Sequence, residues 1–196
     1  MSGGYVICEY EKVKDYFPEY QRTLASLHSA LVAKAAADWA PKTFGGMSPR
    51  SDQFGESPIM PELFRNMANT TLTSWNQWLS ATGHQTVMSG SNSANIYEDY
   101  KIGLAGIAFL DKSIGISEIK MQISDKKLPR INIEEAFSYN KPAVIFEDGY
   151  IIDEETGFHL YAYVLSTGYQ RLKLIGFQLN RVPNKLQTTN TGAALT

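Results

Sequence analysis

The chain has 196 residues and a formal net charge of −2 at pH 7, and 19% of its residues are charged, which is below the ~25% typical of soluble domains. This length suffices for one sizeable core, and the low charge fits either ordinary variation or a surface partly covered by partners, because interfaces are depleted in Lys and Glu. Basic and acidic residues are balanced in each half, with 7 and 9 in residues 1–98 and 11 and 11 in residues 99–196, which argues against a protein that coats nucleic acid through a basic face.

Cysteine content and hydropathy bear on the cellular compartment. The single cysteine, Cys8, excludes an intrachain disulfide framework and a cysteine zinc cluster. The N-terminus lacks the basic segment and the apolar stretch of a secretory signal, and the longest apolar run, residues 102–110, has nine residues, too few for the ~20 that span a bilayer. We therefore expect a protein without a membrane span that is not secreted by a signal peptide and is cytoplasmic or associated with a particle such as a virion.

A strand or ordered arm in residues 1–10 precedes the first predicted helix, residues 18–37. Pro18 suits the first helical turn, and apolar residues recur at intervals of three and four, which predicts one buried stripe. The stripe consists of Tyr20, Leu24, Leu27, Leu31 and Ala35.

Residues 42–60 predict a long loop with four Gly- or Pro-containing turns. Such loops tend to be functional or ordered by a partner. The aromatic residues Phe44 and Phe54 either anchor this loop on its own domain or reach a neighbouring subunit, so both are candidate interaction residues. Pro61 then opens a second predicted helix to about Ser80, with Gly83 as its C-terminal cap. Its apolar stripe would be Phe64, Met67, Thr71, Trp75, Trp78 and Leu79.

Residues 84–95 are polar and rich in Gly, Ser and Asn, and they predict a second loop. From residue 96 onward the sequence patterns are those of β-strands. Residues 101–110 fit a strand or a helix, and their glycines favour the strand. Residues 116–123 alternate between apolar and polar side chains, as a half-buried strand does. A turn at 124–127, a short extended piece at 128–133 and one helical turn at 134–139 follow.

An antiparallel β-meander is predicted for residues 141–183. Turns that contain Asp-Gly or Thr-Gly between runs of β-branched and aromatic residues are strong hairpin signals, because Gly adopts a positive φ without steric cost. The expected strands are residues 143–146, 150–152, 158–165 and 171–180, with turns at 147–149, 154–157 and 166–168.

These elements together predict an α+β fold. Seven or eight short strands, about ten residues apart, are typical of a β-sandwich or a jelly roll. We therefore expect a helical N-terminal region (residues 1–83), an antiparallel, jelly-roll-like β-sandwich (84–183) and an extended C-terminal tail (184–196).

Nothing in the sequence predicts a catalytic, cofactor or metal site. The three histidines, His28, His84 and His159, are far apart in the chain, and the common nucleophile, phosphate, dinucleotide and zinc motifs are absent. His84 alone lies in a predicted loop, where site residues often lie, and a pairing of Cys8 with a histidine would require the two to meet in space.

Acidic residues gather in two successive predicted turns. Carboxylates there could bind Ca²⁺, and a pair could serve glycoside hydrolysis. Turns at opposite ends of one hairpin are roughly 10–20 Å apart, however, since each residue advances ~3.3 Å, so they cannot form one site within the monomer. Solubilising turn residues are the simpler interpretation. The residues are Glu147, Asp148, Asp153, Glu154 and Glu155.

Aromatic and basic residues near the C-terminus could form a platform for single-stranded nucleic acid, in which bases stack and phosphates pair with cations. Tyr161 and Tyr163 share one face of their strand, and Tyr169, Arg171 and Lys173 follow. Tyr is also favoured at protein–protein interfaces, so we expect Tyr161, Tyr163, Arg171 and Lys173 to make protein contacts, with nucleic acid an unlikely partner.

The function that these patterns favour is structural. Residues 134–155 contain seven carboxylates and one basic residue, whereas residues 156–196 contain four basic residues and no acid. This segregation suits a contact between copies of the chain, or two faces of a sheet in water. We expect a subunit of a larger assembly, such as a capsid, cement or tail protein of a viral or phage-like particle, that binds copies of itself or other structural proteins without a cofactor. The alternatives are a ligand- or carbohydrate-binding β-sandwich module and a hydrolase that uses the acidic turns or His84.

Overall fold

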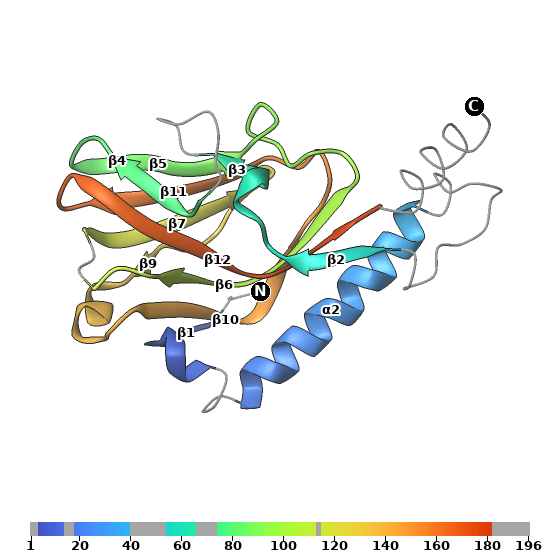
Figure 1. Ribbon diagram of the computed structural model, residues 1–196, viewed down its shortest axis with the longest axis horizontal. Coiled ribbons are helices and arrows are strands. Elements are labelled where there is room, and N and C mark those ends of the chain that lie inside the picture. The colour runs from blue at the N-terminus through green and yellow to red at the C-terminus, as the bar shows by residue number, and fades with distance from the viewer. Residues whose placement is uncertain (1–3, 14–17, 40–53, 66–73, 113–114, 182–196) are drawn as a thin grey trace, which may run out of the picture.

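Two antiparallel sheets pack face to face, and one α-helix lies against the outside of one of them, in the computed structural model of the chain (Figure 1). The described residues are 4–13, 18–39, 54–65, 74–112 and 115–181. The predicted tail, residues 184–196, and Phe44 lie outside these ranges. The fold is therefore β-sandwich-like, as the strand spacing predicted.

Each sheet has six strands. Sheet 1 contains, in spatial order, β1 (Tyr5–Glu9), β10 (Pro142–Ile152), β6 (Tyr100–Phe109), β12 (Gly168–Asn180) and β2 (Gly55–Pro58), with β4 (Asn76–Leu79) paired to the start of β12. Sheet 2 contains β3 (Phe64–Arg65), β5 (Gly83–Gly90), β11 (Phe158–Val164), β7 (Ile116–Ile123) and β8 (Lys126–Lys127), with β9 (Ile131–Asn132) also paired to β7. In the described ranges the helix is α2 (Pro18–Trp39), and the 3₁₀ turns are η1 (Tyr10–Lys12), η5 (Pro61–Leu63) and η6 (Glu134–Ser138).

The chain from β4 to β12 is arranged as one long hairpin about the turn at residues 124–125. Beside the turn β7 pairs with β8 and β9, and then, moving outward, β6 pairs with β10, β5 with β11 and β4 with β12. These pairs lie alternately in sheet 2 and sheet 1, so the hairpin is wound around the core. The apolar faces of both sheets are thereby buried against each other.

The predicted meander is wrong in its pairing. Residues 142–152 form one strand, β10, whose two halves both pair with β6, and the predicted turn at 147–149 is an irregularity between Ile145 and Tyr150. Gly149, with φ of +68°, allows the detour. The turns that follow β10 and β11 lead to the opposite sheet. A turn sequence specifies a reversal of the chain, whereas the partner strand is selected by burial of the apolar face.

The second predicted helix is also wrong where the structure describes it. Residues 61–63 form η5 and residues 64–65 and 76–79 are strands. In β4 the side chains of Gln77 and Leu79 are buried while Trp78 is exposed, which is the period of two of a strand. Strands β1 to β4 pair in both sheets, so the described part of residues 1–83 contributes strands to both sheets, and α2 is the single α-helix among the described residues.

The predicted loop at 84–95 is largely strand, because β5 covers residues 83–90. Its first residues are Gly or polar, and its two buried apolar residues, Val87 and Met88, are adjacent because the pairing with β11 shifts register there, so the sequence shows no alternation. The predicted strands at 1–10, 101–110, 116–123 and 158–165, and the 3₁₀ turn within 134–139, are confirmed within a few residues.

The first predicted helix is confirmed, and its stripe is the face that packs on the outside of sheet 1, against β10, β6 and β12. Tyr20, Leu27, Leu31 and Ala35 are buried and Leu24 is partly buried. Strand β6 is consequently covered on both faces, by the inter-sheet core and by α2. All of its residues from 101 to 109 are buried, which explains why its nearly continuous apolar run fitted a strand and a helix equally well.

Within the described ranges, no helix has both the length and the apolar character needed to cross a bilayer.

Candidate functional site

A hollow of about 410 Å³ lies on the outer face of sheet 2. Its floor is built by neighbouring strands β5, β11 and β7, whose inward residues fill the core and whose alternate residues therefore point outward. This alternation was predicted for β7, and it places Glu118, Lys120 and Gln122 in the hollow. The rim adds Lys127 of β8 and Arg130.

Two tyrosines of β11 stand in the hollow, as their shared strand face predicted. Tyr163 is 40% exposed, and its ring meets that of His84 edge-on at 4.9 Å between centroids. The ring of Tyr161 stacks on that of His159 at 5.8 Å, and its hydroxyl donates to Gln122 Oε1 at 3.4 Å. Aromatic faces and neutral amides thus lie side by side across the sheet.

The charge of the hollow is positive. Three cations line it, Lys120, Lys127 and Arg130, against one carboxylate, Glu118. Glu118 Oε1 lies 3.3 Å from Arg130 Nη1, so that carboxylate is already paired. Among the residues that the structure describes, neither lysine has an ion-pair partner. The arrangement suits a ligand that is polar and anionic.

The residues that could have formed a platform for single-stranded nucleic acid are not brought together. Tyr161 and Tyr163 lie on the outer face of sheet 2, whereas Arg171 and Lys173 lie on β12 in sheet 1. The reason is the sheet crossing between β11 and β12, which separates residues that are close in sequence. Tyr169, on the same side of β12 as Arg171, contacts Trp78 of β4 at 4.7 Å between ring centroids, and Lys173 lies over the ring of Tyr10 at 5.7 Å.

Phe54 packs on its own chain. Its ring meets that of Trp39, at the end of α2, edge-on at 5.4 Å, and it belongs to the apolar cluster around Leu31 and Leu179. Of the two interpretations of this aromatic residue, the intramolecular anchor is the one that the contact supports.

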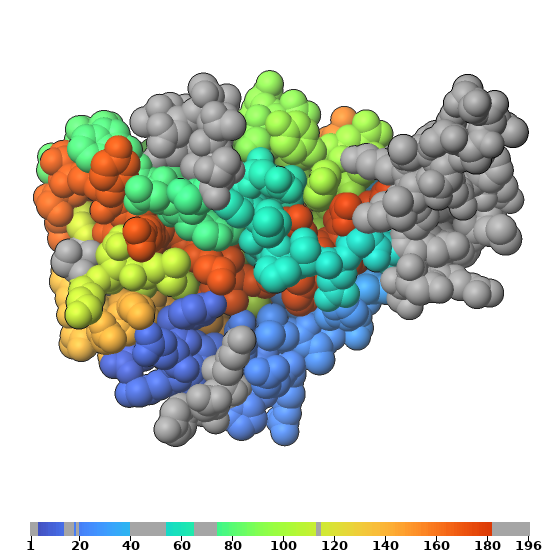
Figure 2. Space-filling view, in the orientation of Figure 1, coloured from blue at the N-terminus to red at the C-terminus, as the bar shows by residue number. Residues whose placement is uncertain are grey.

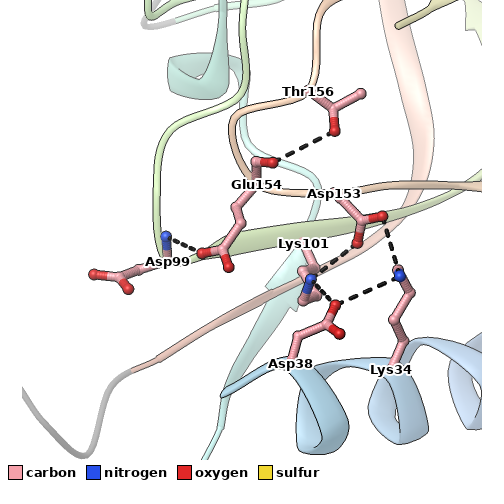
Figure 3. A network of polar contacts seen from close by, with 7 residues as sticks. All are labelled: Lys34, Asp38, Asp99, Lys101, Asp153, Glu154 and Thr156. Atoms are coloured by element: carbon pink, nitrogen blue, oxygen red, sulfur yellow. Dashed lines mark hydrogen bonds and ion pairs between the residues drawn. The ribbon is translucent and has the colours of Figure 1, made fainter. Parts of the chain in front are cut away.

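Asp153 and Glu154, two of the acids at the second predicted turn, form internal contacts (Figure 3). Lys101, which is 1% exposed, lies between Asp38 of α2, at 2.7 Å, and Asp153, at 2.9 Å, and its ammonium lies over the ring of Trp39. Lys34 bridges the same two carboxylates at 3.5 and 3.3 Å. We call Lys34, Asp38, Lys101 and Asp153 the Lys101 network.

The Lys101 network fastens the end of α2 to the loop between β10 and β11. The hydrogen bond from Lys101 is the main reason that the pKa of Asp38 is lowered, and the charge of Asp153 is the main reason that the pKa of Lys34 is raised. Both shifts favour the charged forms, so the network is structural in character. Glu154 also makes an internal contact, because its carboxylate accepts a hydrogen bond from the Asp99 backbone N–H at 2.9 Å.

Among the described residues, Cys8 and the three histidines are not brought together as a nucleophile and a base. Burial raises the pKa of the Cys8 thiol, which disfavours the reactive thiolate. His28 contacts Glu56 at 3.0 Å, and His84 and His159 contact tyrosines. In the described ranges no group of three or more His, Cys, Asp or Glu side chains is placed to hold a metal ion.

Comparisons of the chain with protein-family models, curated proteins and solved structures give no match. The cations of the hollow were not predicted as site residues, although the alternation of residues 116–123 already placed Glu118, Lys120 and Gln122 on one face. What no local pattern supplied was the pairing of β7 with β11, which brings this face beside Tyr161 and Tyr163.

Proposed function

We propose that this protein is a structural subunit of a larger assembly, such as a viral or phage-like particle, and that it acts through contacts with copies of itself. The observation that carries the proposal is an exposed surface of Trp78, Tyr169 and Arg171 on the outer face of sheet 1, which we call the aromatic surface. Trp78 is 40% and Tyr169 is 67% exposed. Aromatic residues and Arg are enriched at protein–protein interfaces and dominate their binding energy.

The position of the aromatic surface supports this role. The start of β12 and its partner β4 lie at the end of the molecule remote from α2, orange-red beside green in Figure 2. The helix covers only the other part of sheet 1, through its contacts with β10, β6 and the later residues of β12. Helix α2 therefore does not cover Trp78 and Tyr169, which are exposed.

The strand order supports a jelly roll as the finer description of the sandwich. The orders β4-β12-β6-β10 and β5-β11-β7-β8, with each neighbouring pair drawn from one wound hairpin, correspond to the two four-stranded sheets of that architecture. Jelly rolls occur in viral capsid proteins, but also in lectins and cupins, so this order supports the proposal only together with the aromatic surface.

The charge pattern favours a head-to-tail contact between copies. The aromatic surface includes the exposed Arg171, with Lys173 next to it on β12, whereas the exposed carboxylates Glu147 and Asp148 lie in the irregular part of β10. A contact between these two different regions pairs opposite charges, and a heterologous contact of this kind repeats into rings or filaments.

A mass measurement tests this proposal. The purified protein is expected to self-associate, and Trp78→Ser with Tyr169→Ser is expected to weaken association by at least about tenfold, since truncated hot-spot residues cost about 2 kcal/mol or more. The measurement is multi-angle light scattering across a concentration series. Tyr97→Ser is the matched control, because Tyr97 is 42% exposed outside the aromatic surface.

Two outcomes would contradict the proposal. One is a wild-type protein that stays monomeric up to about millimolar concentration, at which even weak contacts of about −4 kcal/mol would be seen. The other is equal association by the double variant and the control, which would place the contact elsewhere. Circular dichroism melts establish that all variants fold.

A second function, binding of a small ligand, is favoured by the hollow on sheet 2. Hydrolysis has less support. The hollow is lined by one carboxylate, Glu118, among the described residues, whereas glycoside hydrolysis needs two.

A further inference from the structure

We propose that the hollow on the outer face of sheet 2 binds an acidic sugar, namely a hexose unit of an oligosaccharide that carries a carboxylate or a sulfate. The proposal is independent of the assembly proposed above, because the hollow and the aromatic surface are on opposite outer faces of the sandwich.

The size and floor of the hollow suit a sugar ring. A volume of about 410 Å³ lies in the range of small-molecule sites, ~300–1,000 Å³. Tyr161 and Tyr163 are two residues apart on one strand face, so their Cα atoms are about 7 Å apart along β11. The C–H face of a pyranose packs on an aromatic ring, and a tyrosine hydroxyl remains available for a hydrogen bond.

The polar groups of the hollow match the hydroxyls of a sugar. Thr86 and Gln122 line it, and amides and hydroxyls both donate and accept hydrogen bonds. Neutral groups with both capacities recognise hydroxyls, which also donate and accept. A purely phosphate-binding surface would need donors alone.

The cations specify the charge of the ligand. Lys127 lies opposite Gln122 in the β7–β8 pair, which brings its side chain to the hollow beside Lys120. Neither lysine has a described ion-pair partner, while Arg130 is held by Glu118. A carboxylate or sulfate placed between the two lysines gains charge-assisted hydrogen bonds, and Glu118 disfavours a long polyanion.

The ligand test compares an acidic trisaccharide with its uncharged methyl ester and adds a sulfated disaccharide as a second acidic probe. Isothermal titration calorimetry is carried out with trigalacturonic acid, with its trimethyl ester and with a sulfated disaccharide. We expect the wild-type protein to bind at least one acidic probe about tenfold more tightly than the neutral ester, and to bind it more weakly at high salt, because salt screens exposed charges. Equal affinity for acid and ester, or binding of none of the acidic probes, overturns the proposal. Tighter binding of a ten-nucleotide oligo-dT also overturns it, in favour of a nucleic-acid site.

Two lysine variants test whether the acidic probe binds in the hollow. Lys127→Gln is expected to weaken binding of the acidic probe about tenfold and to leave the weaker binding of the ester unchanged. Lys126→Gln is the matched control, because Lys126 is also exposed on β8 but pairs with Ile123 and does not line the hollow. Equal effects of the two substitutions overturn the proposal.

The aromatic contribution is tested separately. Tyr161→Ala is expected to weaken binding of acid and ester alike, about tenfold, whereas Tyr161→Phe retains the ring and is expected to retain most of the affinity. The phenylalanine variant also guards against misfolding of the alanine variant. If both variants bind like the wild-type protein, the tyrosine does not contact the sugar and the proposal fails.

Discussion

Substitution of Gly176 by Ala is expected to destabilise the protein by about 2–6 kcal/mol, the sum of backbone strain and overpacking. Gly176 lies in the long strand β12 with φ of +143°, a value that residues with a side chain rarely adopt. An added Cβ would fall on the carbonyl oxygen of Gly103 in the paired strand β6 and would also press on Ile59, 3.1 Å away. The two central strands of sheet 1 would have to separate.

Gly168 provides the matched control for this prediction. Its φ is +144°, nearly the same, yet nothing lies within 4 Å of an added Cβ. Gly168→Ala is therefore expected to cost only the backbone strain, about 1–3 kcal/mol. Urea denaturation of both variants separates strain from the strand clash, and equal losses would show that β6 and β12 are not packed as closely as described.

The second large effect is expected when Lys101 loses both carboxylate partners. The double variant Asp38→Asn with Asp153→Asn is expected to lose about 3–5 kcal/mol of stability, as for a buried ion pair broken by removal of its partner. The ammonium of Lys101 is 1% exposed and could regain little hydration. Lys34, held by the same carboxylates, would then repel it.

Removal of the lysine instead is expected to cost much less. Lys101→Met retains the apolar stem on Trp39 and removes the buried charge, so we expect a loss below about 1.5 kcal/mol. Asp38 and Asp153 are 40% and 34% exposed, so water and Lys34 still solvate them. Thermal denaturation ranks the variants by their loss of stability. A loss in Lys101→Met as large as that in the double variant would contradict the proposed cost of an unpaired Lys101 charge.

Acidification provides an independent readout of the Lys101 network. The pKa of Asp38 is lower in the folded protein than its ordinary value of 3.8, so its contribution to stability is fully present above about pH 4 and is lost as the pH falls through the folded pKa. The stability difference between the wild-type protein and the double Asn variant should therefore shrink below pH 4. A constant difference down to about pH 2 would contradict the role of Asp38.

Local patterns predicted those elements that bury one regular face. The stripe from Tyr20 to Ala35 and the alternation of residues 116–123 each specify both the element and the side that faces the core. A helix was wrongly predicted for residues 61–80 because their scattered apolar residues fit the helical period of 3.6 as well as the strand period of two. Trp78, which was assigned to the buried stripe of that helix, is exposed in spite of its size. In β5 the buried apolar residues Val87 and Met88 are adjacent, so the alternation typical of a strand was missing.

The candidate site was predictable only in part, because it depends on which strands are neighbours. Tyr161 and Tyr163 were correctly placed on one face, since this follows from strand geometry alone. That Arg171 would lie on the other sheet, and that Lys120 and Lys127 would take its place, depends on pairings chosen by the burial of whole strands. The same holds for Lys101, whose partners are 63 and 52 residues away in the chain.

The wound hairpin also determines how the chain can be made. Among the hydrogen-bonded pairs of the wound hairpin, β7 and β8 are nearest in sequence, and each pair farther out closes a longer loop, which slows folding. On the ribosome, β6 emerges well before its partners β10 and β12, and its apolar run has no sheet to join until residue 142 and beyond have been synthesised. A chain of this design passes through an aggregation-prone stage at which most of it already exists, so cellular yield should depend more on protection of the nascent β6 strand by chaperones than on the stability of the finished fold.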